Sequence, residues 1–481
     1  MRNITFKGLY GLCDQFPLKK SFILVMLLFL CGITLKAADN SQVVVKLDKP
    51  GRLPSCPEVS SSTTNLKVIG FLNGADMYYL RKMAGCDNDG RPTKGKLATL
   101  DLSEANILTG NYIYLSMSGE FYFNGLQSVN LVHDEKDAIC QFEFSNCNAL
   151  KKIILPSSLK SIRRYAFQDC TNLQSVEFSS DSIEMENSVF SGCTRLYDVK
   201  LPKKLVKIPA STFSGCKNLR SCEIPSALKE IGVAAFADCA LNKITIPSTV
   251  TKIGAAAFEN CDKLLSIELP SGLLEIESET FQGCEFLGKI VLPSQLVKIG
   301  DWAFSQCGCL LHVEFPNTLQ EIGDGAFYNN CLLQVDLPPN LVRIDDYAFE
   351  SGTFRELKLP KSLTYIGRSA FGSCEELSSV YVFWNQIPNL DVAYAFDEVP
   401  MEQCTLYVPK GKVAQYKSSS NWSYFKNIVE FDATGIDKVV TSTNVKEVSR
   451  YSVNGQRLSA PTKGLNIVKY SDGSVKKVAV Q

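Results

Sequence analysis

Hydrophobic residues recur along most of this chain with a period of 22 or 23 residues. One unit, residues 292–315, reads LPSQLVKIGDWAFSQCGCLLHVEF, and its frame is LP-x-x-L-x-x-I-x-x-x-AF-x-x-C-x-x-L-x-x-I-x-L. A constant frame with variable residues between indicates a solenoid, in which each coil buries its apolar face against its neighbours. The phenylalanine of the frame stands at Phe144, Phe167, Phe190, Phe213, Phe236, Phe258, Phe281, Phe304, Phe327, Phe349 and Phe371.

Each unit predicts one short β-strand, because apolar and variable residues alternate in segments such as Leu264–Leu269. Pro270 follows, and the strand ends there because proline lacks the N–H donor that a sheet needs. The Ala-Phe pair of the frame begins a compact turn or a short helix on the opposite side. We therefore expect a solenoid with one parallel strand per coil and turns or short helices on its convex side.

Nine of the eighteen cysteines stand three residues after the repeat phenylalanine. Equivalent side chains point the same way about 4.8 Å apart, farther than the Cβ separation of about 3.8 Å in a disulfide. We expect this cysteine ladder to consist of buried free thiols. Cys309 and Cys331 precede neighbouring repeat leucines and could pair if oxidised, and a Cys56–Cys86 bridge is also open. The ladder comprises Cys147, Cys170, Cys193, Cys216, Cys239, Cys261, Cys284, Cys307 and Cys374, with Asn330 and Gly352 as interruptions.

The N-terminus has the pattern of a secretory signal peptide. Basic residues precede the apolar segment Ser21–Leu35, and Ala37 and Ala38 follow it, so we expect cleavage near one of these alanines. A lipoprotein interpretation of Leu28–Cys31 is the alternative. Leu30 argues against it, because a small residue is expected before a lipidated cysteine.

The segments that flank the repeats predict caps, which a solenoid needs to keep its terminal coils from exposing the core. Leu66–Phe71 predicts a strand, Asn73-Gly74 a turn, Ala75–Met83 a helix and Leu97–Ser103 a degenerate repeat strand. The predicted organisation is a signal peptide (1–38), an N-terminal cap with degenerate repeats (39–130), the repeat solenoid (131–382), a C-terminal cap (383–431), a linker (432–447) and a small β-unit (448–481).

The frame resembles the BspA-like class of bacterial leucine-rich repeats over residues 131–382, and the segments Leu66–Met83 and Leu406–Glu430 resemble the caps of that family. The tail, with hairpin turns at Asn454-Gly455 and Asp472-Gly473, is similar to C-terminal sorting domains of the type IX secretion route. The resemblance implies a secreted or cell-surface protein, displayed on the outer membrane of an anaerobic Gram-negative bacterium. Several members of the family are adhesins for host proteins.

The sequence offers little for catalysis. His133, expected in a loop, and His312 are the only histidines, and neither has a Ser or Cys partner suggested by its position. Asp87–Gly90 resembles the start of a calcium loop, but Arg91 and Pro92 break the ligand series. Fifty basic and fifty acidic residues leave no net charge, which does not favour nucleic acid as a partner. We therefore expect no enzyme, no cofactor and no metal.

The variable residue inside each predicted strand points away from the core, so these residues form a candidate concave binding face, here called the strand column. Glutamates occupy every second coil from Glu177 to Glu314, a spacing that a merely solvated surface would also show. We expect an extracellular protein that binds another protein. A glycan-capture surface is the alternative, and a peptidase or other hydrolase a third possibility. The strand column comprises Glu177, Lys200, Glu223, Thr245, Glu268, Val291, Glu314, Asp336, Lys358 and Tyr381.

Overall fold

The structure is a computed structural model that describes residues 41–123, 126–133, 135–388, 394–432, 447–452, 457–458, 460, 464–470 and 475–480. The chain divides into two compact units, Met1–Leu205 and Val206–Gln481. The expected signal peptide, most of the expected linker and both hairpin turns of the tail lie outside the described residues. No helix in the described part of the chain is long and apolar enough to cross a membrane.

The first unit begins with a cap built around one helix. Strand β1 (Val43–Leu47) pairs in parallel with β2 (Asn65–Leu72), and α2 (Gly74–Met83) follows β2 directly, which confirms the predicted strand and helix. Asn73, expected in a turn, caps the helix: its side chain accepts hydrogen bonds from backbone N–H groups of the first turn. The carboxylate of Asp76 in turn accepts from Asn73 N at 3.0 Å, which completes a capping box.

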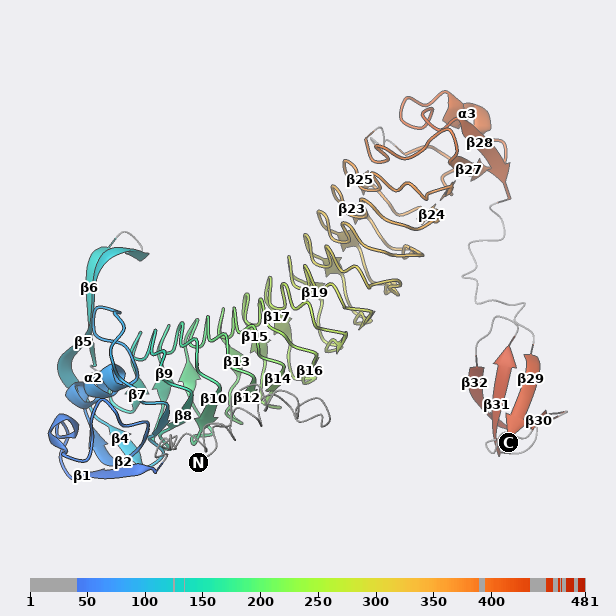
Figure 1. The fold of residues 1–481 in the computed structure, drawn as a ribbon. Helices are drawn as coiled ribbons and strands as arrows, with labels where there is room; N and C mark the ends of the chain where they lie inside the picture. The colour runs from blue at the N-terminus through green and yellow to red at the C-terminus, as the bar shows by residue number, and fades with distance from the viewer. Residues whose placement is uncertain are drawn as a thin grey trace, which may run out of the picture. The chain divides into compact units, whose positions relative to one another are not determined.

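A long antiparallel hairpin comes between this cap and the regular coils. Strands β5 (Gly110–Phe123) and β6 (Leu126–His133) pair with each other and extend away from the neighbouring coils (cyan in Figure 1). The repeat frame contains no information about this hairpin. The expected loop position of His133 is therefore wrong, because His133 is the last residue of β6.

Regular coils contribute short parallel strands to three successive sheets, as predicted, and the coils make a parallel-strand β-solenoid. Ile267, for example, stands opposite Ile244 in the preceding coil and Ile290 in the following one. The first unit contains β3 (Thr99–Asp101), β4 (Ala105–Ile107), β8 (Lys152–Leu155), β10 (Ser175–Phe178) and β12 (Asp198–Lys200). The second contains β14 (Ser221–Glu223), β16 (Lys243–Thr245), β18 (Ser266–Glu268), β20 (Lys289–Val291), β24 (Glu356–Leu359) and β26 (Ser379–Val382).

Most coils also contribute a second strand of two residues, which we did not predict. Its isoleucine is the one in the frame: Ile231 stands opposite Ile208 and Ile253. In the first unit these strands are β7 (Ala138–Ile139), β9 (Ser161–Ile162) and β11 (Glu184–Met185). In the second they are β13 (Lys207–Ile208), β15 (Glu230–Ile231), β17 (Lys252–Ile253), β19 (Glu275–Ile276), β21 (Lys298–Ile299), β22 (Glu321–Ile322), β23 (Arg343–Ile344) and β25 (Tyr365–Ile366).

The Ala-Phe segment of each described coil forms turns, and the alternative of short helices is wrong there. Tyr165 and Asp169 adopt left-handed backbone conformations, with φ of 61° and 56°. A residue with a left-handed backbone conformation interrupts a right-handed helix. Their segment bonds to the next coil instead: Phe167 N donates to Val189 O at 2.9 Å, and Asp169 N to Ser191 O at 2.8 Å.

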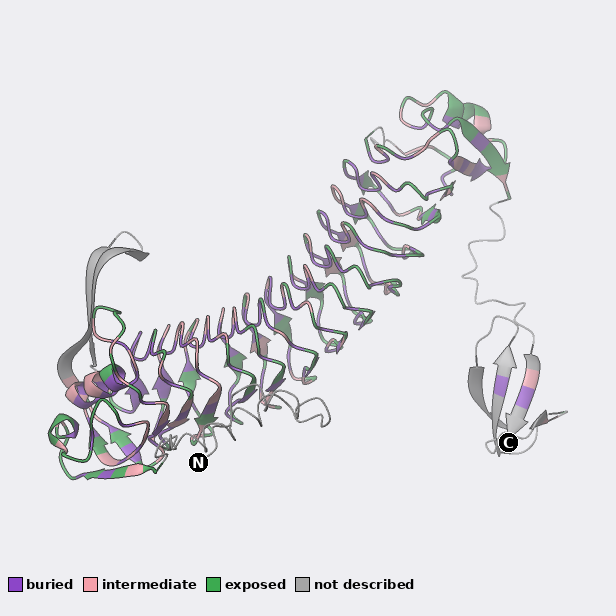
Figure 2. Cartoon of the chain, in the orientation of Figure 1, coloured by how far each residue is buried: buried purple, intermediate pink, exposed green. Residues whose placement is uncertain are grey.

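Two ladders run through the core, where buried residues recur in every described coil (Figure 2). The ring of Phe258 stacks between those of Phe236 and Phe281, at 5.6 Å from each and with the planes within 2° of parallel. Beside the rings, the thiol of Cys261 donates to the carbonyl oxygen of Phe236 at 3.2 Å. The ladder cysteines are buried and free, which confirms the interpretation of this column.

The two interruptions of the cysteine ladder have local causes. Asn330 is buried and replaces the thiol as a donor, because its Nδ2 lies 2.9 Å from the carbonyl oxygen of Phe304. Gly352 leaves room for the ring of Phe354, which a Cβ at this position would clash with.

The second unit ends in a cap and a separate small sheet. Strands β27 (Thr405–Pro409) and β28 (Asn427–Phe431) continue the parallel pairing of β24 and β26. Helix α3 (Val413–Lys417) lies between them in sequence, and Trp422 is buried beneath. The antiparallel sheet of the tail comprises β29 (Glu447–Ser452), β30 (Arg457–Leu458), β31 (Gly464–Tyr470) and β32 (Val475–Val480).

Candidate functional site

The strand column lies on the exposed side of the main strands. Thr245, Glu268 and Val291 stand directly opposite one another on β16, β18 and β20, and Lys358 stands opposite Tyr381. Every column residue is exposed except Tyr381, which is half buried. The other members are Glu223, Glu314 and Asp336 in the second unit, and Glu177 and Lys200 in the first.

Two charged residues of the strand column, Glu177 and Lys358, have ion-pair partners close by. In the first unit, the carboxylate of Glu177 lies 2.5 Å from Lys152 Nζ. In the second, Lys358 Nζ lies 2.6 Å from a carboxylate oxygen of its strand neighbour Glu356. Exposed pairs of this kind contribute little to stability. These ion pairs therefore lie at the surface, and the strand column remains a candidate binding face.

An apolar patch adjoins the column in the second unit. Its members are more exposed than large apolar side chains usually are: Leu265 60%, Phe286 46%, Val291 55%, Leu311 48% and Leu333 64%. Contiguous exposed apolar surface marks interaction sites in proteins. This apolar patch is therefore a candidate binding surface of the unit.

Backbone hydrogen bonds join two pairs of neighbouring coils along the apolar patch, and Gly288, which has no side chain, stands between Leu265 and Leu311. Gly288 N donates to Leu265 O at 3.1 Å, and Leu333 N donates to Leu311 O at 3.0 Å. Gly288 leaves a notch, because a Cβ built there would meet only carbonyl oxygens, at 3.8 Å and beyond. Lys263 Nζ lies 5.2 Å from the centre of the Phe286 ring and borders the patch with a positive charge.

We did not predict the apolar patch, because the frame identifies only the residues that face inward. Three of its members directly follow a buried repeat leucine, in the pairs Leu264-Leu265, Leu310-Leu311 and Leu332-Leu333. Such leucine doublets are the feature of the sequence that could have revealed it, since the frame has room for only one inward leucine at this position.

Two open hollows lie near these surfaces in the second unit. One, of about 390 Å³, is lined by column residues Glu223 and Thr245 together with Lys243. The other, of about 420 Å³, is polar and includes Lys263 and Glu285, so it adjoins the apolar patch. Both hollows are open to solvent, and each includes at least two charged residues.

A stack of aromatic rings borders the column at the C-terminal cap. The rings of Tyr381 and Tyr407 lie 4.4 Å apart and 9° from parallel, and Phe431 meets Tyr381 edge to face at 5.5 Å. Lys358 Nζ lies 5.9 Å from the Tyr381 ring. Burial, and then the charge of Glu356, raise the pKa of Tyr381, so its hydroxyl stays a donor at neutral pH.

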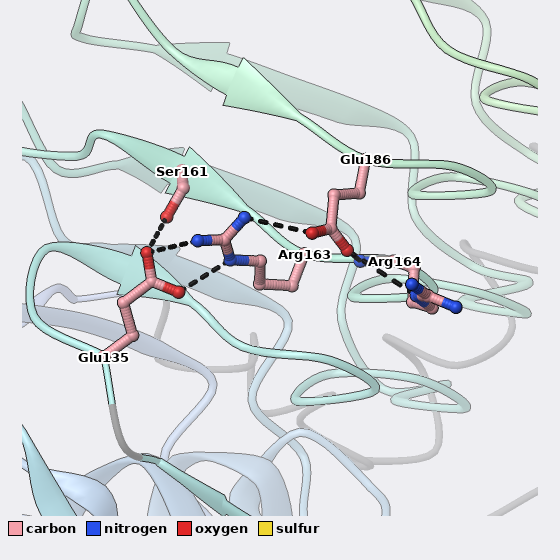
Figure 3. Close-up of polar contacts among 5 residues, drawn as sticks. All are labelled: Glu135, Ser161, Arg163, Arg164 and Glu186. Carbon is pink, nitrogen blue, oxygen red and sulfur yellow. Dashed lines mark hydrogen bonds and ion pairs between the residues drawn. The ribbon is translucent and has the colours of Figure 1, made fainter.

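A polar cluster in the first unit fastens coils together and offers no free acid or base (Figure 3). Arg163 Nε and Nη2 each lie 2.6 Å from an oxygen of Glu135, and Nη1 lies 3.0 Å from Glu186. Ser161 donates to Glu135, and Arg164 N donates to Glu186 at 3.0 Å. The hydrogen bonds to Glu135 raise the pKa of Arg163. The arginine therefore stays charged and occupies both carboxylates.

Of the two histidines, the structure describes side-chain contacts for His312. His312 is half exposed and lies 4.0 Å from Glu314, the only ion pair recorded for it among the described residues. Within the described ranges, no group of three or more His, Cys, Asp and Glu residues could hold a metal ion.

The family model described as "BspA type Leucine rich repeat region (6 copies)" matches residues 117–241, 229–354, 275–400 and 342–459. A leucine-rich repeat protein from Bacteroides ovatus is 25% identical over 65% of this chain and 67% of its own, with a TM-score of 0.41.

Two other solved structures are less similar in sequence. The pneumococcal vaccine antigen PcpA is 21% identical over 59% of this chain and 80% of its own (TM-score 0.42). A leucine-rich cell surface protein from Faecalibacterium prausnitzii is 20% identical over 71% and 90% (TM-score 0.34). No curated protein matches the chain. The matched segments of the family model cover most of the chain, which belongs to the BspA-type leucine-rich repeat family.

Proposed function

We propose that this protein is a non-enzymatic, secreted or cell-surface protein that binds an extracellular protein through the apolar patch and the neighbouring strand column. Leucine-rich repeat solenoids are typically binding scaffolds without catalytic activity. The exposure of the apolar patch is the observation that carries the proposal, because such a surface is costly in water unless a partner covers it.

The surroundings of the patch indicate the chemistry of the partner. Glu268 stands directly opposite Val291, and Glu314 occupies the same column two coils further along. A partner that presents an apolar side chain with basic residues around it would complement both features, since buried apolar anchors supply most affinity and rim charges steer association. We infer that the partner is a basic segment of a host extracellular protein, which makes the chain an adhesin.

Binding of the full chain to a panel of purified matrix and plasma proteins tests this proposal. The triple variant Leu265→Ser, Leu311→Ser, Leu333→Ser should lower affinity at least about tenfold, as loss of interface anchors does. Val233→Ser is the matched control, because Val233 is 52% exposed but lies outside the apolar patch. Charge reversal at Glu223, Glu268 and Glu314 should weaken binding further and alter its salt dependence.

Unchanged affinity in both multiple variants, with folding intact, would show that the binding surface lies elsewhere. A glycan-capture role is the second candidate, and the Tyr381–Tyr407 stack is the observation that favours it. Glycan-array binding that disappears in Tyr381→Ala and Tyr407→Ala, without any protein ligand, would establish that alternative.

We further propose that residues 1–38 direct export and that residues 448–481 direct display on the outer-membrane surface by the type IX route. The tail sheet pairs only with itself among the described residues, in the order β30-β29-β31-β32. Deletion of Tyr451–Gln481 should therefore leave the solenoid folded but reduce surface display. Cell fractionation decides this, and undiminished surface display would overturn the sorting role.

A further inference from the structure

In the second unit, the first residues of the two-residue strands alternate in charge from coil to coil. Glu230 stands opposite Lys252, and Lys298 stands between Glu275 and Glu321. All members are exposed or half buried. Their strands β15 and β17 follow one another in a row apart from β14 and β16 (Figure 1). This charge ladder comprises Glu230, Lys252, Glu275, Lys298, Glu321 and Arg343.

Ion pairs within the charge ladder leave its charges at the surface. Lys298 Nζ lies 3.5 Å from a carboxylate oxygen of Glu275, and both side chains are 43% exposed. Exposed pairs of this kind are worth at most about 1 kcal/mol each. The alternation keeps like charges from standing opposite each other on neighbouring coils, and the same charges stay accessible to a partner.

Two exposed apolar residues lie at the middle of the charge ladder. Leu274 and Val297 directly precede Glu275 and Lys298, and they are 61% and 37% exposed. They belong to neighbouring coils, because Val297 N donates to Leu274 O at 2.8 Å. This face therefore has an apolar centre with charges on both sides, which is the arrangement found in protein interfaces.

A two-fold axis between the coils of Glu275 and Lys298 makes this face complementary to itself. The axis reverses the order of the coils in a second copy, so Glu275 meets Lys298 of that copy and Leu274 meets its Val297. Further out, Lys252 meets Glu321 and Glu230 meets Arg343, so every facing pair has opposite charges.

The spacing of the charges also favours a second copy as the partner. Neighbouring coils repeat at about 4.8 Å, and a partner must present opposite charges at the same repeat to match all of them. Another charge ladder has this repeat by construction. A two-fold interface uses the same surface of both copies, and it closes after two subunits.

We propose that the charge ladder is the interface of a symmetric, antiparallel homodimer of this protein, centred on Leu274 and Val297. The ladder shares no residue with the apolar patch or the strand column, so this proposal goes beyond protein binding by those surfaces. A dimer carries two apolar patches, which raises the avidity for a partner with repeated binding sites.

Sedimentation equilibrium of the full chain, with urea unfolding to check that each variant folds, tests the proposal. The wild type should form a dimer. Glu275→Lys and Lys298→Glu should each weaken dimerisation at least about tenfold, because the symmetry places two like-charged pairs at the centre of the interface. Lys289→Glu is the matched control and should dimerise like the wild type, since Lys289 is exposed on β20 outside the charge ladder.

An equimolar mixture of Glu275→Lys and Lys298→Glu gives the sharpest result. Each variant supplies the charge that the other has lost, so the mixture should form a heterodimer with affinity near that of the wild type. The mixture also separates association from stability, because an effect within one chain cannot be restored by a second chain.

Three results would overturn the proposed dimer. The first is a wild-type chain that stays monomeric up to its limit of solubility. The second is dimerisation that neither single variant weakens, which would place the interface elsewhere. The third is a mixture that associates no better than the separate variants, which would confine the role of the ladder to contacts between coils of one chain. A monomer can still bind a protein through the apolar patch, so the two proposals fail independently.

Discussion

Replacement of Asn330 by cysteine should stabilise the solenoid. The Nδ2 group of Asn330 donates to the carbonyl oxygen of Phe304 at 2.9 Å, as a thiol does in the other coils of the ladder. The oxygen of the same amide has no equivalent hydrogen bond. Its Oδ1 is buried and has no hydrogen-bond partner among the described atoms. Asparagine thus keeps the donor of the ladder but adds an acceptor that the core does not satisfy.

The size of the effect follows from these two groups. A buried acceptor without a partner costs about 1–3 kcal/mol. Cysteine removes this acceptor and keeps a donor, although an S–H group donates more weakly than an amide N–H. The weaker S–H hydrogen bond lowers this gain by about half of a net hydrogen bond, which is worth about 1 kcal/mol. We therefore expect Asn330→Cys to raise the free energy of unfolding by about 1 kcal/mol.

Urea unfolding of the full chain under reducing conditions, with amide exchange of the coils around Phe304 and Phe327, measures this change. Asn330→Asp is the control, because a carboxylate of the same size cannot donate to Phe304 and would bury a charge. It should unfold at much lower urea concentration. A neutral or destabilising effect of Asn330→Cys would refute the cost assigned to the unsatisfied Oδ1 of Asn330.

Three further predictions concern the core and the coil contacts. Phe258→Ala should destabilise the fold by about 3–5 kcal/mol, measured by urea unfolding, because it empties a fully buried site within the ring stack. Arg163→Met should cost about 1–3 kcal/mol in the same assay, since it leaves two glutamates without their shared partner, and Glu135→Gln in that background should recover part of the loss. Burial raises the pKa of Cys261, Cys307 and Cys374 to about 12. The native state therefore holds these protons more tightly than the unfolded chain. The stabilisation from the buried thiols is fully present below about pH 8.5, and above that pH the free energy of unfolding falls by about 1.4 kcal/mol per pH unit for each thiol. A melting temperature independent of pH between 9 and 11 would contradict this.

Much of the core could be predicted from sequence because burial repeats with the frame. Phe258 and Cys261 occupy frame positions that every coil must bury, and in the structure both residues have no exposed surface. A residue that recurs at one register position in stacked coils meets its own equivalents. The frame therefore specified contacts between residues far apart in the chain, which single-segment patterns seldom do.

The turns and the hairpin could not be predicted in the same way. The Ala-Phe segment cannot form a helix when two of its variable positions, such as Tyr165 and Asp169, adopt a left-handed backbone conformation. The residue types at these positions do not predict that conformation. The second strand contains only two residues, too few to show alternation. Strands β5 and β6 lie outside the frame altogether, where periodicity offers no guide.

The apolar patch could not be predicted from the sequence for a related reason. Leu310 and Leu311 are the same residue type and adjacent in the chain, yet Leu310 is fully buried and Leu311 is 48% exposed. Position in the coil, rather than residue type, decides which leucine builds the core and which meets a partner. Because the frame leaves that second position open, substitutions there can alter recognition without disturbing the Phe and Cys ladders. Membership of the repeat family therefore fixes the scaffold of this protein, and the proposed function assigns recognition of the partner to residues such as Leu265, Leu311 and Leu333, which the frame does not constrain.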